Sequence, residues 1–171
     1  MVMPDRLFPA TAMDYKTWWR ALWPDPDGVV RALHIEPGMT VVDLGCGDGY
    51  FTAAIARQIS PVHIIGVDLD PAMLAQAKVA CEGENHCDWV LGDAMDLRHL
   101  IRSAVDFVLI ANTFHGVPDK TALAREVAAI LVPTGASRSS IGIPLPAKKR
   151  LFWGSHEGRE PSCACRPTPR A

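Results

Sequence analysis

Val41-Val-Asp-Leu-Gly-Cys-Gly-Asp-Gly49 is the stretch of sequence that decides the fold. It begins in an apolar run, Thr40–Leu44, which predicts a strand buried on both faces. Its second half spaces three glycines as Gly-x-Gly-x-Gly, which predicts a sharp turn where a ligand can approach the backbone without meeting a Cβ atom. Tyr50 stands where the dinucleotide fingerprint has its third glycine, so the turn disfavours NAD and FAD.

Outward from this stretch, apolar runs alternate with amphipathic segments between about residues 40 and 131. This alternation predicts βα units around a parallel sheet, and hence an α/β protein with a doubly wound sheet. The expected strands 1 to 4 are residues 40–44, 63–68, 88–91 and 105–111. The expected helices are residues 50–58, 71–80, about 97–103 and 120–131, with a short helix begun by Asp25 and Pro26 before the first strand.

Acidic residues follow three successive predicted strands. Asp43 lies at the end of the first strand, Asp68 at the end of the second and Asp93 just after the third. Ligands of open parallel sheets bind at the carboxyl ends of the strands, so we expect these carboxylates to converge on one crevice. Asp68 can accept hydrogen bonds from both ribose hydroxyls of an adenosine-type cofactor, and Leu69 can lie against its adenine ring. Asp93 has an alternative role as a helix cap.

Asp-x-Gly-x-Gly-x-Gly after an apolar strand resembles the first motif of class I S-adenosylmethionine-dependent methyltransferases, and Gly92-Asp93-Ala94 resembles their third site. The resemblance covers roughly residues 14–135. It implies a Rossmann-like sheet ordered 3-2-1-4-5-7-6, with S-adenosyl-L-methionine as the cofactor and Asp93 accepting from the adenine amino group. A structural left-handed turn is the alternative for the glycines. The cofactor-binding residues that the resemblance implies are Asp43, Gly45, Cys46, Gly47, Gly49, Asp68, Leu69, Asp93, Ala94 and Asn112.

The segment after the fourth strand bears on the methyl acceptor. It reads Asn112-Thr-Phe-His-Gly-Val-Pro-Asp119, without the Asn-Pro-Pro-aromatic motif of many enzymes that methylate amino groups of nucleic acids and proteins. It is more similar to the branch of the family that acts on small molecules, so we expect a small-molecule methyl acceptor. Histidine titrates near neutral pH, which suits His115 to act as a general base. A histidine that only lines the pocket is the alternative.

The sequence changes character after residue 135. Residues 1–133 hold 10 Lys or Arg and 17 Asp or Glu, a net charge of −7, whereas residues 134–171 hold 7 and 2, a net charge of +5. Ala136–Pro144 and the prolines that follow are unsuited to a buried strand, so the C-terminal strands are expected to be degenerate or missing.

We therefore divide the chain into an S-adenosylmethionine-binding methyltransferase domain at 1–135, incomplete at its C-terminal side, and a basic, Pro-rich, atypical tail at 136–171. A shifted reading frame is one hypothesis for the tail, which the nucleotide sequence of the gene decides. The alternative function is accordingly a truncated or frameshifted methyltransferase fragment without catalytic activity.

The composition of the chain limits the cellular locations, metals and partners that we expect for it. The chain starts without a basic stretch followed by an apolar run, and it contains no apolar stretch of roughly 18 residues, so neither a signal peptide nor a membrane association is expected. The five cysteines lack the spacing of a disulfide framework, which favours a reducing, cytoplasmic location. Cys163-Ala-Cys165 lacks partners at ligand spacing, so no metal site is expected. The net negative charge of residues 1–133 argues against a nucleic-acid partner. The basic tail leaves open the role of an adaptor that binds nucleic acid.

Overall fold

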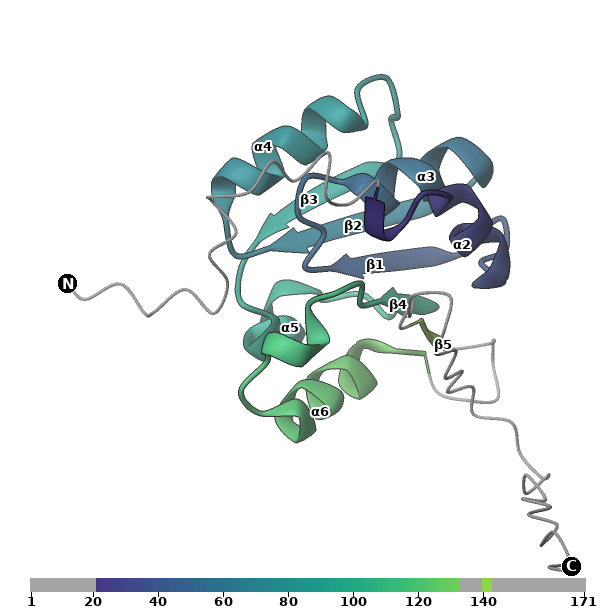
Figure 1. Ribbon diagram of the computed structural model, residues 1–171. Coiled ribbons are helices and arrows are strands. Elements are labelled where there is room, and N and C mark those ends of the chain that lie inside the picture. The colour runs from purple at the N-terminus through teal and green to yellow at the C-terminus, as the bar shows by residue number, and fades with distance from the viewer. Residues whose placement is uncertain (1–20, 133–139, 143–171) are drawn as a thin grey trace, which may run out of the picture.

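The computed structural model describes residues 21–132 and 140–142, which form a three-layer α/β arrangement (Figure 1). Its middle layer is a five-stranded sheet with the order β3-β2-β1-β4-β5. Every neighbouring pair of strands is parallel, as the sequence predicted for strands 1 to 4. The strands are β1 (Thr40–Leu44), β2 (His63–Asp68), β3 (Cys87–Leu91), β4 (Phe107–Leu109) and β5 (Ser140–Gly142).

Helices cover both faces of this sheet, which makes it doubly wound (Figure 1). One layer holds α2 (Pro26–Ala32), α3 (Tyr50–Gln58) and α4 (Pro71–Ala80); the other holds α5 (Leu97–Leu100) and α6 (Lys120–Ile130). Two 3-10 turns, η2 (Ala94–Asp96) and η3 (Phe114–Gly116), follow β3 and β4. Among the described residues, no helix has the length and apolar character needed to cross a bilayer.

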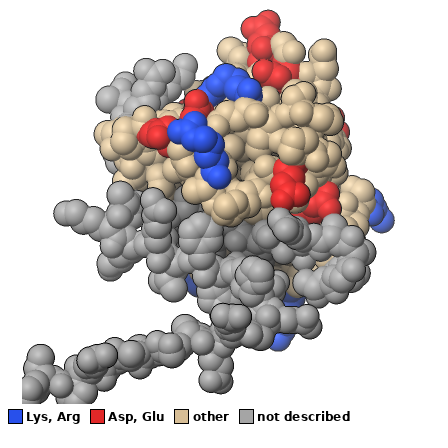
Figure 2. Space-filling view, turned by 90° about the vertical axis from the view of Figure 1, so that its right-hand side faces the viewer, with Lys and Arg blue, Asp and Glu red and all other residues tan. Residues whose placement is uncertain are grey.

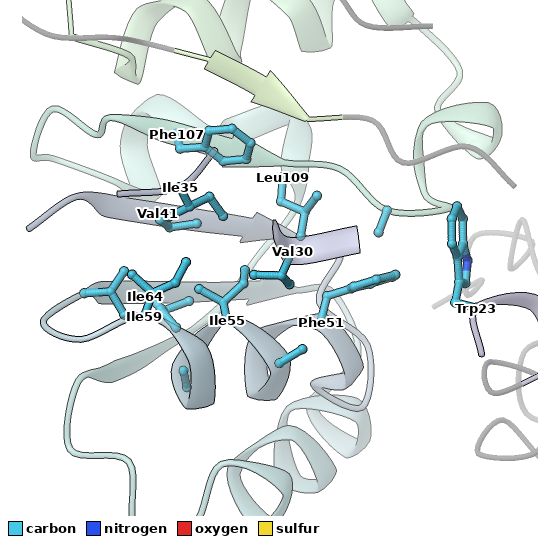
Figure 3. Packing of buried hydrophobic residues seen from close by; sticks show 14 residues of the cluster. Trp23, Val30, Ile35, Val41, Phe51, Ile55, Ile59, Ile64, Phe107 and Leu109 are labelled. Carbon is cyan, nitrogen blue, oxygen red and sulfur yellow. The ribbon is translucent and has the colours of Figure 1, made fainter. Parts of the chain in front are cut away.

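Each face of the sheet has its own hydrophobic cluster. The first lies between the sheet and α3, where Ile55 meets Val41 of β1 and Leu109 of β4, all fully buried (Figure 3). The second lies on the opposite face, where Val127 of α6 packs with Val42 of β1. Because β1 contributes to both clusters, the strand that carries the glycine turn is held from two sides.

Local sequence signals explain where several elements begin. The Met39 N–H donates to the Glu36 carbonyl (3.3 Å) across Pro37-Gly38, and Gly38 has a φ of +90°, as a type II turn requires. The Asp25 carboxylate accepts from the Gly28 N–H at 2.7 Å and so caps α2.

The start of α4 follows the same rule. The Asp70 carboxylate accepts from the Ala72 N–H at 2.8 Å, and Pro71 occupies the first helical position. Both helix starts confirm the sequence prediction.

The structure differs from the expected boundaries around β4. Val105 makes only an isolated bridge to Leu131, and the chain leaves the sheet after Leu109, so β4 is shorter than the predicted strand. Where the sequence predicted a degenerate or missing strand, Ser140–Gly142 pairs with β4 as a strand of three residues. Such short pairing uses backbone groups alone and needs no apolar run. Residues 136–139 and 143–171 of the predicted tail lie outside the described residues, so the hypothesis of a shifted frame stays a prediction.

A matched pair of substitutions tests how far the fold depends on the second cluster. Val127 in α6 is 1% exposed and Val79 in α4 is 71% exposed. Val127→Ala removes two buried methyl groups and is expected to lower the free energy of unfolding by about 2 kcal/mol. Val79→Ala makes the same chemical change at the surface and is expected to change it by about 0.5 kcal/mol or less. Chemical denaturation of both variants measures the difference, and equal effects would contradict the placement of α6 on the sheet.

Candidate functional site

The glycine turn lies at the carboxyl edge of the sheet, where the strand order reverses between β1 and β4. The N–H groups of Gly45 and Cys46 both donate to the Val67 carbonyl, at 2.8 and 3.1 Å. These bonds fix the turn to the end of β2. Gly49 ends the turn in a left-handed conformation and is the N-cap of α3. Such a reversal of strand order is the place where open α/β sheets form a ligand crevice.

The three glycines of the turn serve different purposes. A Cβ atom on Gly45 would lie 2.3 Å from the Thr113 hydroxyl, and one on Gly49 would lie 2.9 Å from the Ala77 Cα atom. These two glycines therefore allow close packing against the β4 loop and against α4. A Cβ atom on Gly47 would meet nothing within 4 Å, although its φ of +55° still favours glycine. Gly47 is thus the glycine beside which the described structure leaves room for a ligand.

Asp68 is held rigidly at the end of β2. One carboxylate oxygen accepts from the Gly47 N–H at 2.8 Å and the other from the Asp70 N–H at 2.9 Å. Burial raises the pKa of Asp68, while the hydrogen bonds from the two amides lower it. A carboxylate has about four lone-pair sites, so each oxygen can still accept a further hydrogen bond. This arrangement suits the predicted contact to a pair of hydroxyl groups.

Asp43 is 1% exposed, and its Oδ2 accepts from the Thr52 hydroxyl at 2.6 Å. Burial raises the pKa of Asp43 to about 6; the hydrogen bond from Thr52 lowers it, and the nearby carboxylates of Asp68 and Asp48 raise it further. Three acidic groups thus lie close together near the glycine turn. A positively charged group bound there would relieve their mutual repulsion.

A pocket opens between the glycine turn and the loop after β4. Four predicted site residues line it together: Asp43, Gly45, Cys46 and Asn112. The remaining lining residues are Asp48, Tyr50, Phe51 and Ala111.

Asn112 brings a hydrogen-bond donor to this pocket. It adopts a φ of +59°, and its side-chain amide nitrogen is buried without a partner among the described residues. An unsatisfied buried donor is costly, so this group suits an oxygen of a bound ligand. Carboxylates and an amide donor therefore line the same pocket.

Cys46 lines the same pocket with a buried, protonated thiol and not with a thiolate. Its thiol is buried and lies 3.9 Å from the Gly47 carbonyl, to which it donates. Burial is the largest cause that raises the pKa of Cys46, so the thiol stays protonated. Its predicted contact to the cofactor stays a prediction.

Three further predicted residues lie after β2 and β3. Leu69 is 66% exposed, as a platform for an aromatic ring requires. Asp93 caps η2, with its Oδ1 accepting from the Met95 N–H at 2.8 Å, and Ala94 is the first residue of η2. The alternative role of Asp93 as a cap is therefore present in the structure, and its contact to adenine stays a prediction.

His115 belongs to η3, the turn that follows β4. Its side chain lies outside the described part of the molecule, so its role as a base stays a prediction.

Sequence reasoning missed residues that only tertiary contacts reveal. Thr52 is fully buried and fixes the Asp43 carboxylate. The Tyr50 hydroxyl donates to the Trp23 carbonyl at 2.6 Å, and the rings of Trp23 and Phe51 pack edge to face with centroids 5.8 Å apart. Figure 3 shows Trp23 beyond Phe51, at the end of the cluster. The spacing of Thr52 nine residues after Asp43 was the one available signal, since it places Thr52 in the first turn of the next helix.

Comparisons with known proteins show which family the chain belongs to. Residues 41–135 match the family model described as a methyltransferase domain. A demethylmenaquinone methyltransferase from Lactobacillus johnsonii is 33% identical over 109 residues, which cover 61% of this chain and 44% of that protein. A carboxy-S-adenosyl-L-methionine synthase from Chromohalobacter salexigens is 31% identical over 133 residues, which cover 74% of this chain and 48% of that protein. The chain spans about half the length of these curated relatives.

Solved structures share the fold. An S-adenosylmethionine-dependent methyltransferase from Geobacter sulfurreducens, in complex with S-adenosyl-L-homocysteine, has a TM-score of 0.56 at 23% sequence identity, over 66% of this chain and 45% of that chain. The family model covers more than half of the chain and begins at the strand that carries the glycine turn. The chain therefore belongs to the methyltransferase domain family, and it shares the Rossmann-like fold of a solved S-adenosylmethionine-dependent methyltransferase.

Proposed function

We propose that this chain binds S-adenosylmethionine at the carboxyl edge of the sheet and transfers its methyl group to a small-molecule acceptor. The observation that carries the proposal is the Asp68 carboxylate, which two backbone amides hold beside the open face of Gly47. An acidic side chain at the end of the second strand of such a sheet can accept hydrogen bonds from ribose hydroxyls. The same carboxylate would suit a dinucleotide, but Tyr50 replaces the glycine that a dinucleotide-binding turn requires.

Different residues of the site would bind different parts of the cofactor. Asp43 and the buried Asn112 amide would bind the methionine end, and Asp68 would bind the ribose. Leu69, Asp93 and Ala94 are left for the adenine. When bound, S-adenosylmethionine supplies an activated methyl group on a positively charged sulfur. The chain's own contribution is to orient that group and its acceptor, because methyl transfer is an in-line displacement whose rate depends strongly on alignment.

Several observations support a small-molecule acceptor. The loop after β4 lacks the Pro-Pro pair of many amino-methylating enzymes. The curated relatives carry names that refer to demethylmenaquinone and to carboxy-S-adenosyl-L-methionine. Among the described residues on the face shown in Figure 2, acidic and basic side chains are interspersed without a continuous basic surface. Binding a nucleic-acid backbone requires clustered Lys and Arg. A cytoplasmic location, which we also propose, fits the free thiols of Cys46, Cys81 and Cys87.

Asp68→Asn tests the cofactor site. The variant keeps the side-chain size and loses the negative charge, so its affinity for S-adenosylhomocysteine is expected to fall by about 2 kcal/mol, or roughly 30-fold. Asp70→Asn is the matched control, because Asn also caps helices well and should leave the affinity nearly unchanged. Isothermal calorimetry measures both. Tighter binding of NADH than of S-adenosylhomocysteine to the unmodified chain would refute the assignment.

The pH dependence of binding tests Asp43. Its pKa of about 6 means that it is mostly protonated at pH 5 and mostly ionised at pH 7.5. Only the ionised form attracts the cofactor's ammonium group, so the affinity for S-adenosylhomocysteine is expected to rise about tenfold between these two pH values. Asp43→Asn should bind more weakly and with a flatter pH profile. If the affinity of Asp43→Asn depends on pH as strongly as that of the unmodified chain, the titration belongs to another group, and Asp68 would be tested first.

His115→Ala tests the proposed base. If the acceptor holds a proton when it binds, turnover of a small-molecule acceptor is expected to fall roughly 100-fold or more, with cofactor affinity unchanged. If only the KM for the acceptor rises, His115 lines the acceptor pocket and does not act as a base. Cofactor binding without any methyl transfer, across acceptors that include phenolic quinols, is the result that the alternative of an inactive fragment predicts.

A further inference from the structure

The loop between β4 and α6 carries two residues of the proposed site. Asn112 lines the pocket beside the glycine turn, and His115, the proposed base, belongs to η3. The regular structure of this loop is a single short turn, in which the Gly116 N–H donates to the Thr113 carbonyl at 3.1 Å. A 3-10 turn of this length is not stable by itself, so contacts from outside the turn have to hold it in place.

One end of the loop is fixed to the glycine turn. Thr113 packs so closely against Gly45 that a Cβ atom on Gly45 would collide with the Thr113 hydroxyl. The same hydroxyl donates to the Ala111 carbonyl at 3.2 Å. Because Thr113 directly follows Asn112, these contacts hold the end of the loop that borders the cofactor pocket.

The other end of the loop is held by Lys120, the first residue of α6. The Lys120 ammonium group lies over the Phe114 ring, 5.8 Å from its centroid, and donates to the Val117 carbonyl at 3.2 Å. Val117 belongs to the second hydrophobic cluster, and Phe114 packs against that cluster. Lys120 therefore contacts the first residue of η3 and the residue that follows its last.

The position of Lys120 is unfavourable for α6 itself. The N-terminus of a helix is the positive end of its dipole, where a cation is destabilising. The Asp119 carboxylate already caps α6 by accepting from the Ala122 N–H at 2.9 Å, so the helix begins without help from Lys120. Lys120 is also exposed, so its replacement should disturb the core little. What a lysine supplies at this position is its contact with η3.

We propose that Lys120 is a positioning residue, which holds η3 in place and so fixes the part of the loop that would face the methyl acceptor. Its effect on turnover rests on the proposed methyl transfer, whereas its hold on η3 does not. The rate of an in-line displacement depends strongly on the alignment of donor and acceptor. A loop that moves should therefore slow methyl transfer without weakening cofactor binding.

Amide hydrogen exchange, measured by mass spectrometry, tests the hold on η3 without any acceptor. Lys120→Met removes the charge and the donor at similar length, so the amides of Gly116 and Val117 are expected to exchange about fivefold faster. Lys120→Arg keeps a cation and a donor and should exchange like the unmodified chain. Arg125→Met removes another exposed cation of α6 and is the matched control. Unchanged exchange in Lys120→Met, or equally faster exchange in Arg125→Met, would overturn the proposal.

Steady-state turnover of a phenolic quinol, with naphthohydroquinone as the probe, separates positioning from support of the fold. Lys120→Met is expected to lower kcat roughly tenfold, with the melting temperature and the affinity for S-adenosylhomocysteine unchanged, and Lys120→Arg should restore kcat. A weaker affinity for S-adenosylhomocysteine, or an unchanged kcat despite faster exchange, would refute a positioning role. If the unmodified chain binds S-adenosylhomocysteine but transfers no methyl group, the catalytic part of the proposed function fails, and the exchange measurement still decides whether Lys120 holds η3.

Discussion

The site depends on one carboxylate that ties three segments together. Asp68 ends β2, accepts from Gly47 of the glycine turn and accepts from Asp70 at the start of α4. Each of these bonds is charge-assisted and partly buried, which makes it stronger than an ordinary hydrogen bond. The position of the turn relative to β2 and α4 is therefore set before any ligand arrives, and the Val67 carbonyl reinforces it by accepting from Gly45 and Cys46.

The same construction leaves the site with too much negative charge. Asp43, Asp48 and Asp68 interact through a largely buried region, and the pKa of Asp43 rises to about 6 as a result of burial and of these neighbours. Thr52 offsets part of this cost by donating to Asp43. A cationic ligand would offset more of this cost. The Asn112 amide nitrogen, which has no partner among the described residues, adds a donor to the same pocket.

The two edges of the sheet divide the chemistry of the chain. The carboxyl edge carries the acidic groups and the glycine turn, and the amino edge carries the turns that lead into the strands, such as the one before β3 in which the Glu84 N–H donates to the Cys81 carbonyl. This separation follows from parallel topology, because every strand begins at one edge and ends at the other.

The sequence by itself determined the main elements and half of the residues that line the pocket beside the glycine turn. Apolar runs located β1 and β2 to the residue, and Asp70-Pro71 located the start of α4, because these signals are local and act within one turn or one strand. Tertiary structure decided what depends on segments far apart in the chain. It gave Gly49 a packing role against Ala77, placed the Thr52 hydroxyl on the Asp43 carboxylate, and paired Ser140–Gly142 with β4 where the composition argued against a strand. Close approach, burial and backbone pairing arise only when distant residues meet, so the order of residues along the chain does not reveal them.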